Sequence, residues 1–288
     1  MLRTGDPARR HRQREQGLML LLASPALLVV LALVVVPVGW FLGLSVYDGG
    51  FTIEHYRRIF VEDVYWRSFA LTFRIALVVT AGTLLLGYPV AYAAARLARP
   101  WDVLILLCVV LPFWTSVLVR TYAWLVLLQR TGLVNQLLTG LDLVGEPLAL
   151  VHNEFGTVVA MVHILLPFMV LPLYAAMKKI PDELILAGAS LGGGPMHVFR
   201  RVFLPLSLPG VVAGLTLVFV LCLGFYITPE LLGGGRTIMV SMVVSRNVEL
   251  YNQWGAASAV AGVLLLAVLA VFFVVGRFLP LDRLLGQK

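Results

Sequence analysis

The sequence has few charged residues, few cysteines and no nucleotide-binding loop. Of its 288 residues, 13% are charged and 60% are hydrophobic, a composition that excludes an ordinary soluble domain. Cys108 and Cys222 both lie in apolar runs without a Cys-x-x-Cys pair, so we expect two core residues and no metal site. The pattern Gly-x-x-x-x-Gly-Lys-Ser/Thr does not occur, which excludes ATP binding through a P-loop.

Clusters of ionisable residues are also missing. His55, His152, His163 and His197 are scattered along the chain, which argues against a membrane enzyme with a site at one depth. A secondary transporter or channel stays the alternative from another class, although paired intramembrane charges and an inverted repeat are not evident. We therefore expect no catalytic residue, no metal and no cofactor, and we interpret His163 as a hydrogen-bonded core histidine.

Long apolar runs dominate what is present. A helix rises about 1.5 Å per residue, so roughly 20 apolar residues cross the hydrocarbon core of a bilayer. The first run is too long for a cleaved signal peptide. The sequence predicts an all-α integral membrane protein with a basic cytoplasmic tail at residues 1–16 and six transmembrane helices, near 17–47, 69–95, 103–119, 156–177, 206–227 and 256–275.

The distribution of positive charge predicts the orientation. The net charge is +7, and with the N-terminus inside, the inner segments carry 14 lysines and arginines and the outer segments carry seven. This ratio supports an N-in and C-in topology by the positive-inside rule. Because these residues lie in tails and short loops, we expect no nucleic-acid partner. Outside the membrane, we expect an interfacial helix at 53–60 and one or two short helices within 120–155.

The loop between the fourth and fifth predicted spans lies in the cytoplasm by this topology. Asp182 and Glu183 after Pro181 favour a helix start, since acids in the first turn face the positive end of the helix dipole. The glycines at 192–194 permit a sharp turn, and Pro195 suits the first position of a second helix. The sequence predicts two short amphipathic helices, which either bind a partner or pack on their own bundle.

This loop resembles the coupling loop of binding-protein-dependent ABC importer permeases. The motif reads Glu-Ala-Ala, three residues, Gly, nine residues and Ile-x-Leu-Pro. The resemblance covers essentially the whole chain, because six spans with this loop between the fourth and fifth are the family layout. It implies a type I importer permease fold, with a five-helix core at 67–280 that contains a coupling loop at 179–205. The motif places are taken here by Leu186, Ala187, Gly188, Gly192, Val202, Leu204 and Pro205.

The resemblance also implies partners. It places the chain in a bacterial inner membrane, in contact with lipid and with a second homologous permease subunit. A dimer of ABC ATPases lies below the membrane and a periplasmic or extracellular solute-binding protein lies above it. The chain itself is then a non-catalytic subunit that forms half of the translocation path.

The motif lacks its usual acid. Leu186 stands where the family has glutamate, and Gly188 stands where it has a second alanine. Leu186 has no charge with which to form the ion pair that the family's glutamate is thought to offer the ATPase. Glu183 lies three residues earlier on nearly the same helical face, and we hypothesise that it takes over this role.

Two further regions resemble permeases of the spermidine/putrescine transporter group. The first is Leu-Pro-Phe-Trp-Thr-Ser at 111–116, followed by Arg-Thr-Tyr-Ala-Trp at 120–124, and the second is the stretch 224–234. Relatives that carry other small organic solutes share them. The resemblance thus implies a polyamine importer, with another solute, such as an amino-acid derivative or a phosphonate, as the alternative.

Candidate path residues are aromatic and charged side chains near the outer ends of the spans. A polyamine would use aromatic faces for cation–π contact and a carboxylate for charge pairing. Alternative roles are interfacial anchoring for the aromatic residues, snorkelling for the arginine and loop capping for the acid. The candidates are Arg74, Trp114, Tyr122, Trp124, Phe225, Tyr226 and Glu230.

Overall fold

The chain is helical, as expected. The computed structural model describes residues 7–47 and 49–278, and within them it has helices and loops but no sheet strand. The helices are α1 (Pro7–Gly43), α2 (Glu54–Val61), α3 (Asp63–Arg96), α4 (Trp101–Val110), the 3₁₀ turn η1 (Leu111–Trp114), α5 (Val117–Leu127), α6 (Leu133–Gly140), α7 (Glu154–Met177), α8 (Asp182–Ser190), α9 (Pro195–Val198), the π-helical turn η2 (Phe199–Phe203), α10 (Leu204–Leu223), α11 (Ile227–Leu232), α12 (Val240–Glu249) and α13 (Trp254–Phe278).

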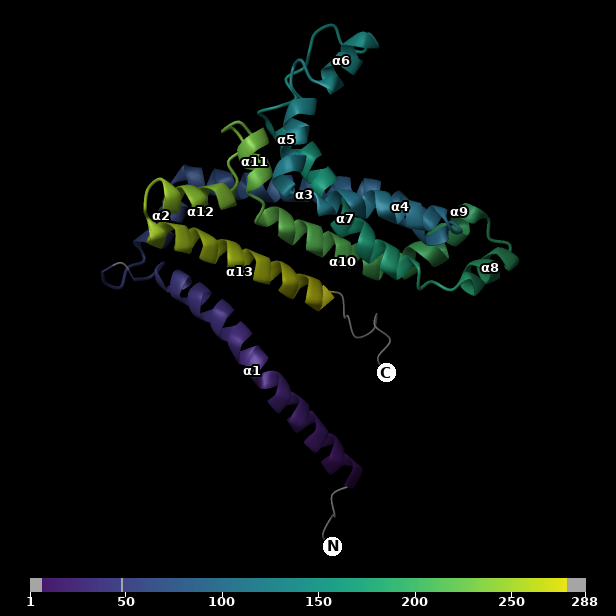
Figure 1. Cartoon of the computed structure of the whole chain (residues 1–288), viewed down its shortest axis with the longest axis horizontal. Helices are drawn as coiled ribbons and strands as arrows, with labels where there is room; N and C mark the ends of the chain where they lie inside the picture. The colour runs from purple at the N-terminus through teal and green to yellow at the C-terminus, as the bar shows by residue number, and fades with distance from the viewer. Residues whose placement is uncertain (1–6, 48, 279–288) are drawn as a thin grey trace.

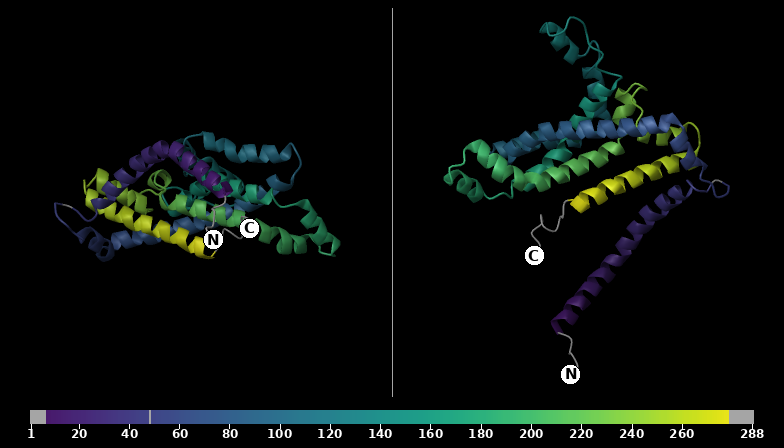
Figure 2. Two further views of the ribbon diagram at one scale, coloured as in Figure 1. Left: turned by 90° about the horizontal axis from the view of Figure 1, so that it is seen from below. Right: turned by 180° about the vertical axis from the view of Figure 1, so that it is seen from behind.

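The bundle is built around α7, which packs against both α3 and α10 (Figure 1). α13 lies beside them and packs on α12, while α1 diverges from the other long helices (Figures 1 and 2). α8 and α9 lie at one end of the bundle, and α2 and α12 lie at the opposite end (Figure 1). The two ends therefore present different surfaces to the two sides of the membrane.

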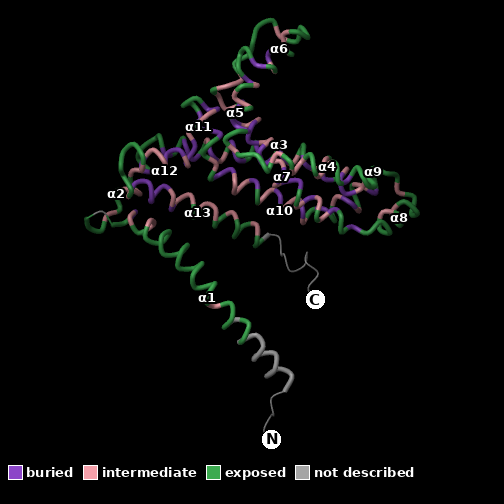
Figure 3. Tube along the Cα trace, in the orientation of Figure 1, coloured by how far each residue is buried: buried purple, intermediate pink, exposed green. Residues whose placement is uncertain are grey.

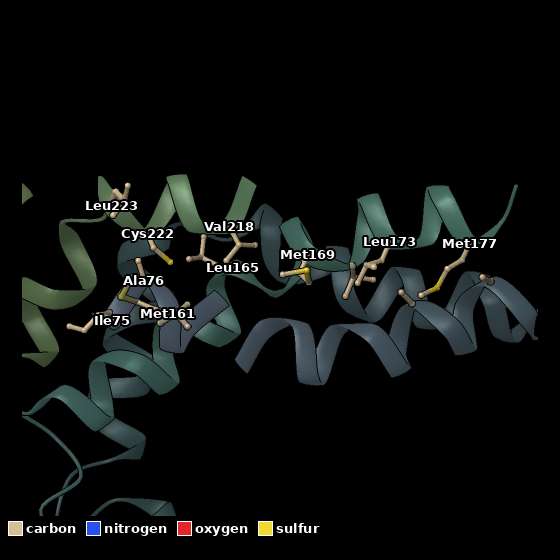
Figure 4. Close-up of a cluster of buried hydrophobic side chains, with 14 of the residues drawn as sticks. Ile75, Ala76, Met161, Leu165, Met169, Leu173, Met177, Val218, Cys222 and Leu223 are labelled. Carbon is tan, nitrogen blue, oxygen red and sulfur yellow. The ribbon is translucent and has the colours of Figure 1, made fainter. Parts of the chain in front are cut away.

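Small residues allow the close approach of the central helices. A Cβ added to Gly210 of α10 would lie 2.6 Å from the Cβ of Ala176 and 3.0 Å from the backbone oxygen of Pro172, both on α7. Helices in lipid gain little from hydrophobic exclusion, so this van der Waals packing is a main source of their association. Figure 4 shows the core between the three helices, which includes Ile75, Ala76, Met161, Leu165, Met169, Leu173, Val218 and Cys222.

The two cysteines have different environments. Cys222 is buried in this core, which confirms the prediction. Cys108 is exposed, so the prediction that it lies in the core is wrong. α4 packs on α3 and α7 along the face that carries Asp102 and Val109, and Cys108 lies outside that face.

Five described helices are long and apolar enough to cross a membrane, and a bent pair makes up to six. The bent pair replaces the third predicted span: α4 with η1 and α5 meet at an angle of 99°. Pro112 lies in η1, Thr115 is extended, and the Ser116 side chain caps the new helix by accepting a hydrogen bond from the Leu118 amide. The span is therefore broken at 115–116.

The first helix differs from its prediction at both ends, since it runs from Pro7 to Gly43 instead of 17–47. Its apolar part, Leu21–Gly43, has no buried residue in the window of highest hydropathy, and Figure 3 shows it exposed along its length. The basic tail at 1–16 lies outside the residues whose side chains the structure describes, as do residues 279–280 at the end of the predicted core.

The fifth span begins earlier than predicted. A continuous helical stretch runs from Pro195 to Leu223, so the second short helix predicted for the loop between the fourth and fifth spans is the start of the fifth span. The sequence Pro209-Gly210 predicts an interruption near the start of this span, and this prediction is wrong, because Pro209 lies within α10 and Gly210 serves the contact with α7. The irregular turn lies instead at η2, and π-helical turns often mark functional sites.

The outer segments contain short helices, as predicted. α2 corresponds to the expected helix at 53–60, and α5 and α6 lie within or overlap 120–155. α6 stands away from the bundle (Figure 1). Asn135 of α6 holds together the segments on either side of this helix. Its side-chain amide donates to the carbonyl groups of Gln129 and Leu148, and its side-chain oxygen accepts from the Leu148 amide.

The contact at Gly210 gives a stability prediction. We expect Gly210→Ala to lower the free energy of unfolding by about 1–3 kcal/mol, because the new methyl group overpacks the α7–α10 contact. Gly276→Ala in α13 is the matched control, since nothing lies within 4 Å of a Cβ at that position. Thermal unfolding of the two variants in detergent measures the difference. Equal melting temperatures would show that the close approach of α7 and α10 is wrong.

Candidate functional site

α8 forms as the sequence predicts, with Asp182 and Glu183 in its first turn. It ends in a Schellman motif: the Gly193 amide donates to the Gly188 carbonyl, and the Gly192 amide donates to the Ala189 carbonyl. Gly192 has φ +83°, the left-handed conformation that this motif requires. The glycine of the motif is thus explained by the geometry of the helix end.

Most of α8 is exposed. None of its residues is buried, and the side chain at the acid position of the motif, Leu186, is 65% exposed, while Leu191 just after the helix is 89% exposed. Gly188 faces the other way, toward Val198 and Val202. The alternative that this loop packs on its own bundle therefore holds for one side only. The motif's Leu204 and Pro205 lie in the first turn of α10.

A cavity of about 440 Å³ separates α8 from the bundle. At its edge, Arg96 of α3 forms an ion pair with Asp182, and its guanidinium carbon lies 4.8 Å from the centre of the Phe203 ring. Glu183 is exposed and has no ion pair among the described residues. Of the two acids that begin α8, one is thus engaged by the bundle and the other faces outward. The cavity is lined by Tyr92, Arg96, Asp182, Ile185, Ala189, Gly193, Pro195, Val198, Phe199 and Phe203.

A second site lies where α5 meets α11 (Figure 1). The buried hydroxyl groups of Thr121 and Thr228 lie 2.9 Å apart in a hydrogen bond. Trp124 donates its indole N–H to Nδ1 of His163 on α7, at 3.1 Å, which confirms that His163 is a hydrogen-bonded histidine. The fold thus joins the two distant regions of sequence, 120–124 and 224–234, through a direct contact.

The burial of Arg120 was not predicted from the sequence. This residue follows the third predicted span and so falls in a segment expected outside the membrane, yet it is 8% exposed, and its Nε and Nη1 atoms are buried without a hydrogen-bond partner in the described part of the chain. Arg120, Trp124 and Leu128 recur at helical spacing on one face of α5 and its end, and this periodicity was the available signal.

The two charged path candidates, Arg74 and Glu230, each form an ion pair with another residue of the chain. Arg74 forms an ion pair with Glu154 at the start of α7, and Glu230 lies 3.8 Å from Arg246 of α12. These pairs are partly exposed at the outer half of the bundle. The carboxylate of Glu230 is therefore not free in this conformation.

The aromatic path candidates fall into two groups. Trp114, at the break between α4 and α5, is 87% exposed, and Tyr122 and Tyr226 are also exposed. Trp124 is partly buried through its contact with His163, and Phe225 packs against the main core. The structure therefore leaves three of the five rings accessible and uses the other two in packing.

The end of the bundle opposite α8 has a pocket of about 400 Å³ between α2, α3 and α12, lined in part by Arg58, Glu62, Arg246 and Asn247. Arg58 donates hydrogen bonds to Glu62 at 3.0 Å and to Gln253 at 3.2 Å. The hydrogen bond with Glu62 raises the pKa of the Arg58 guanidinium, so it stays charged.

Comparison of sequences relates the chain to transport proteins. Residues 83–280 match the family described as "Binding-protein-dependent transport system inner membrane component". The chain is 34% identical over 250 residues to the spermidine/putrescine transport system permease protein PotB of Haemophilus influenzae, which covers 85% of each chain. It is 33% identical over 216 residues to the inner membrane ABC transporter permease protein YdcU of Escherichia coli, with 70% of this chain and 68% of the relative covered.

Comparison with solved structures shows that the fold is similar to that of chains of a bacterial ABC transporter. A chain of a bacterial ABC transporter involved in the import of the acidic polysaccharide alginate matches with a TM-score of 0.67 and 17% identity, over 94% of this chain and 99% of that one. In a complex of the alginate transporter with a periplasmic protein bound to an alginate pentasaccharide, the match has a TM-score of 0.73 and 16% identity, over 96% and 97%. At this identity the likeness concerns the fold alone.

Proposed function

The chain belongs to the binding-protein-dependent transport system inner membrane component family and is a multi-pass permease subunit of a solute importer, and we propose that its solute is a polyamine. The observation that carries the polyamine proposal is the 34% identity to a spermidine/putrescine permease over 85% of both chains. The contact between the segments 120–124 and 224–234 supports it, because both segments resemble that group.

We propose that the energy comes from an ATPase dimer that binds the exposed side of α8. The chain has no P-loop of its own. Leu186 and Leu191 expose apolar surface that a partner groove would cover, and Glu183 supplies a carboxylate that has no ion pair among the described residues. This surface fits a partner that combines an apolar groove with a cation.

The proposed mechanism requires a second permease of similar fold and the N-in, C-in topology with six spans. Closure of the ATPases would bring the two α8 helices together and tilt the bundles between inward-open and outward-open states. Bundles with cores as closely packed as that between α3, α7 and α10 move as units, so a displacement at α8 would reach the outer end.

The solute path is proposed to lie between the two permeases. Trp114, Tyr122 and Tyr226 expose aromatic faces that suit cation–π contact with an ammonium group. Glu230 would contribute its carboxylate only if its contact with Arg246 opened. We therefore propose that the second permease provides most of the carboxylates that bind a polyamine.

Uptake by the reconstituted importer tests the proposed solute. Proteoliposomes would contain this chain together with the ATPase, second permease and binding protein of the same importer. We expect ATP-dependent uptake of labelled spermidine that excess putrescine inhibits. Amino acids and phosphonates serve as competitors that should have no effect. Inhibition by one of these and not by putrescine would replace the polyamine with that solute while leaving the permease role intact.

A substitution at Glu183 tests the replacement of the missing motif acid. We expect Glu183→Gln to reduce transport-coupled ATP hydrolysis by about fivefold or more, because the ATPase would lose its charge partner on α8. Glu249→Gln, at an exposed acid at the other end of the bundle, is the control and should leave the rate unchanged. An unchanged rate in the Glu183 variant would show that this residue does not take over the role.

A further inference from the structure

Arg96, at the end of α3, joins three elements through one side chain. Its guanidinium pairs with the Asp182 carboxylate in the first turn of α8. It also lies over the Phe203 ring of η2, 4.8 Å from the ring centre. The Arg96 side chain is 22% exposed, whereas that of Asp182 is 81% exposed. The arginine is therefore fixed by the bundle, and the aspartate is the part that belongs to the exposed helix.

Aromatic contacts fix η2 against α3. The Tyr92 ring lies 4.9 Å from that of Phe203 and 5.9 Å from that of Phe199, edge-on in both cases. One turn earlier on α3, the Tyr88 hydroxyl lies 2.9 Å from that of Ser207 in a hydrogen bond. The Phe203 ring is consequently well placed to orient the planar guanidinium of the arginine above it.

α8 contacts the bundle near both ends and through Ile185 in its middle. Near the C-terminal end, Gly188 faces Val198, where an added Cβ would lie 3.3 Å from a Val198 methyl carbon. In the middle, Ile185 packs against the main core beside the cavity of about 440 Å³. At the N-terminal end the contact is the ion pair of Arg96 and Asp182. The first two contacts are apolar, so among the described residues the ion pair is the polar contact that can transmit a displacement of α8 to α3.

We propose that Arg96 is a positioning residue, which transmits movement of α8 to α3 through its ion pair with Asp182. The C-terminal end of α8 leads through α9 and η2 into α10. Without the pair of Arg96 and Asp182, α3 would have no polar connection to α8 in the described chain. This inference rests on the proposed role of α8 as the ATPase-binding element.

The pair contributes to geometry more than to stability. An ion pair with a largely exposed carboxylate stabilises a fold little in water. The guanidinium is already desolvated and stacked, so the pair fixes the direction in which α8 approaches α3. Loss of the pair should therefore leave the bundle folded and affect the transfer of movement.

The ratio of solute transported to ATP hydrolysed tests the proposal in the reconstituted complex. We expect Arg96→Gln and Asp182→Asn each to lower this ratio by about fivefold or more, the lower end of typical coupling effects. Arg96→Lys keeps the charge and should restore part of it. Arg99→Gln, at an exposed arginine three residues beyond the end of α3, is the matched control and should behave as wild type. An unchanged ratio in both Arg96→Gln and Asp182→Asn would overturn the proposal.

Hydrogen exchange in the purified full chain gives a readout that needs no transport. We expect Arg96→Gln and Asp182→Asn to speed exchange of the α8 amides severalfold relative to wild type and to Arg99→Gln. Unchanged exchange would show that the pair does not fix α8, and would overturn the inference. If exchange changes as expected but the wild-type complex does not transport spermidine, the polyamine proposal fails while the contact between α3 and α8 stands.

Discussion

The close packing of α7 between α3 and α10 is the contact on which the rest of the structure depends. Helices in lipid associate where small residues let their backbones approach, and Gly210 of α10 provides such a place against Pro172 and Ala176 of α7. The first turn of α7 carries Glu154, which pairs with Arg74, and the other end of α7 leads into α8. Both candidate surfaces are therefore positioned by the same helix.

The exposed side of α8 and the contact between α5 and α11 differ in which groups they bury. α8 exposes apolar side chains such as Leu186, which is costly in water unless a partner covers them. The contact between α5 and α11 is instead closed by buried polar groups, the hydroxyls of Thr121 and Thr228 and the pair of Trp124 and His163. The exposed side of α8 is suited to binding and releasing a partner, whereas the contact between α5 and α11 is suited to holding these two helices in fixed positions.

Sequence patterns predicted the features that depend on local chemistry. Asp182 and Glu183 at the start of α8, and Gly192 at its end, act through helix-end geometry, which the nearby sequence specifies. Features that depend on contacts between distant segments were missed. Pro209 and Gly210 suggested a break, but α7 packs there, and the burial of Arg120 depends on where its own helix, α5, packs against α7 and α11. The bend of 99° after α4 likewise depends on where α5 packs.

The central claim is that the exposed side of α8 is the surface that an ATPase partner covers. The most direct measurement is the reaction of Leu186→Cys with a membrane-impermeant maleimide, in a chain whose own two cysteines have been replaced, with and without the assembled ATPase. Arg99→Cys, also on an exposed position near this end, serves as the reference. We expect the ATPase to protect position 186 and to leave position 99 reactive. Equal labelling of position 186 in both states would contradict it.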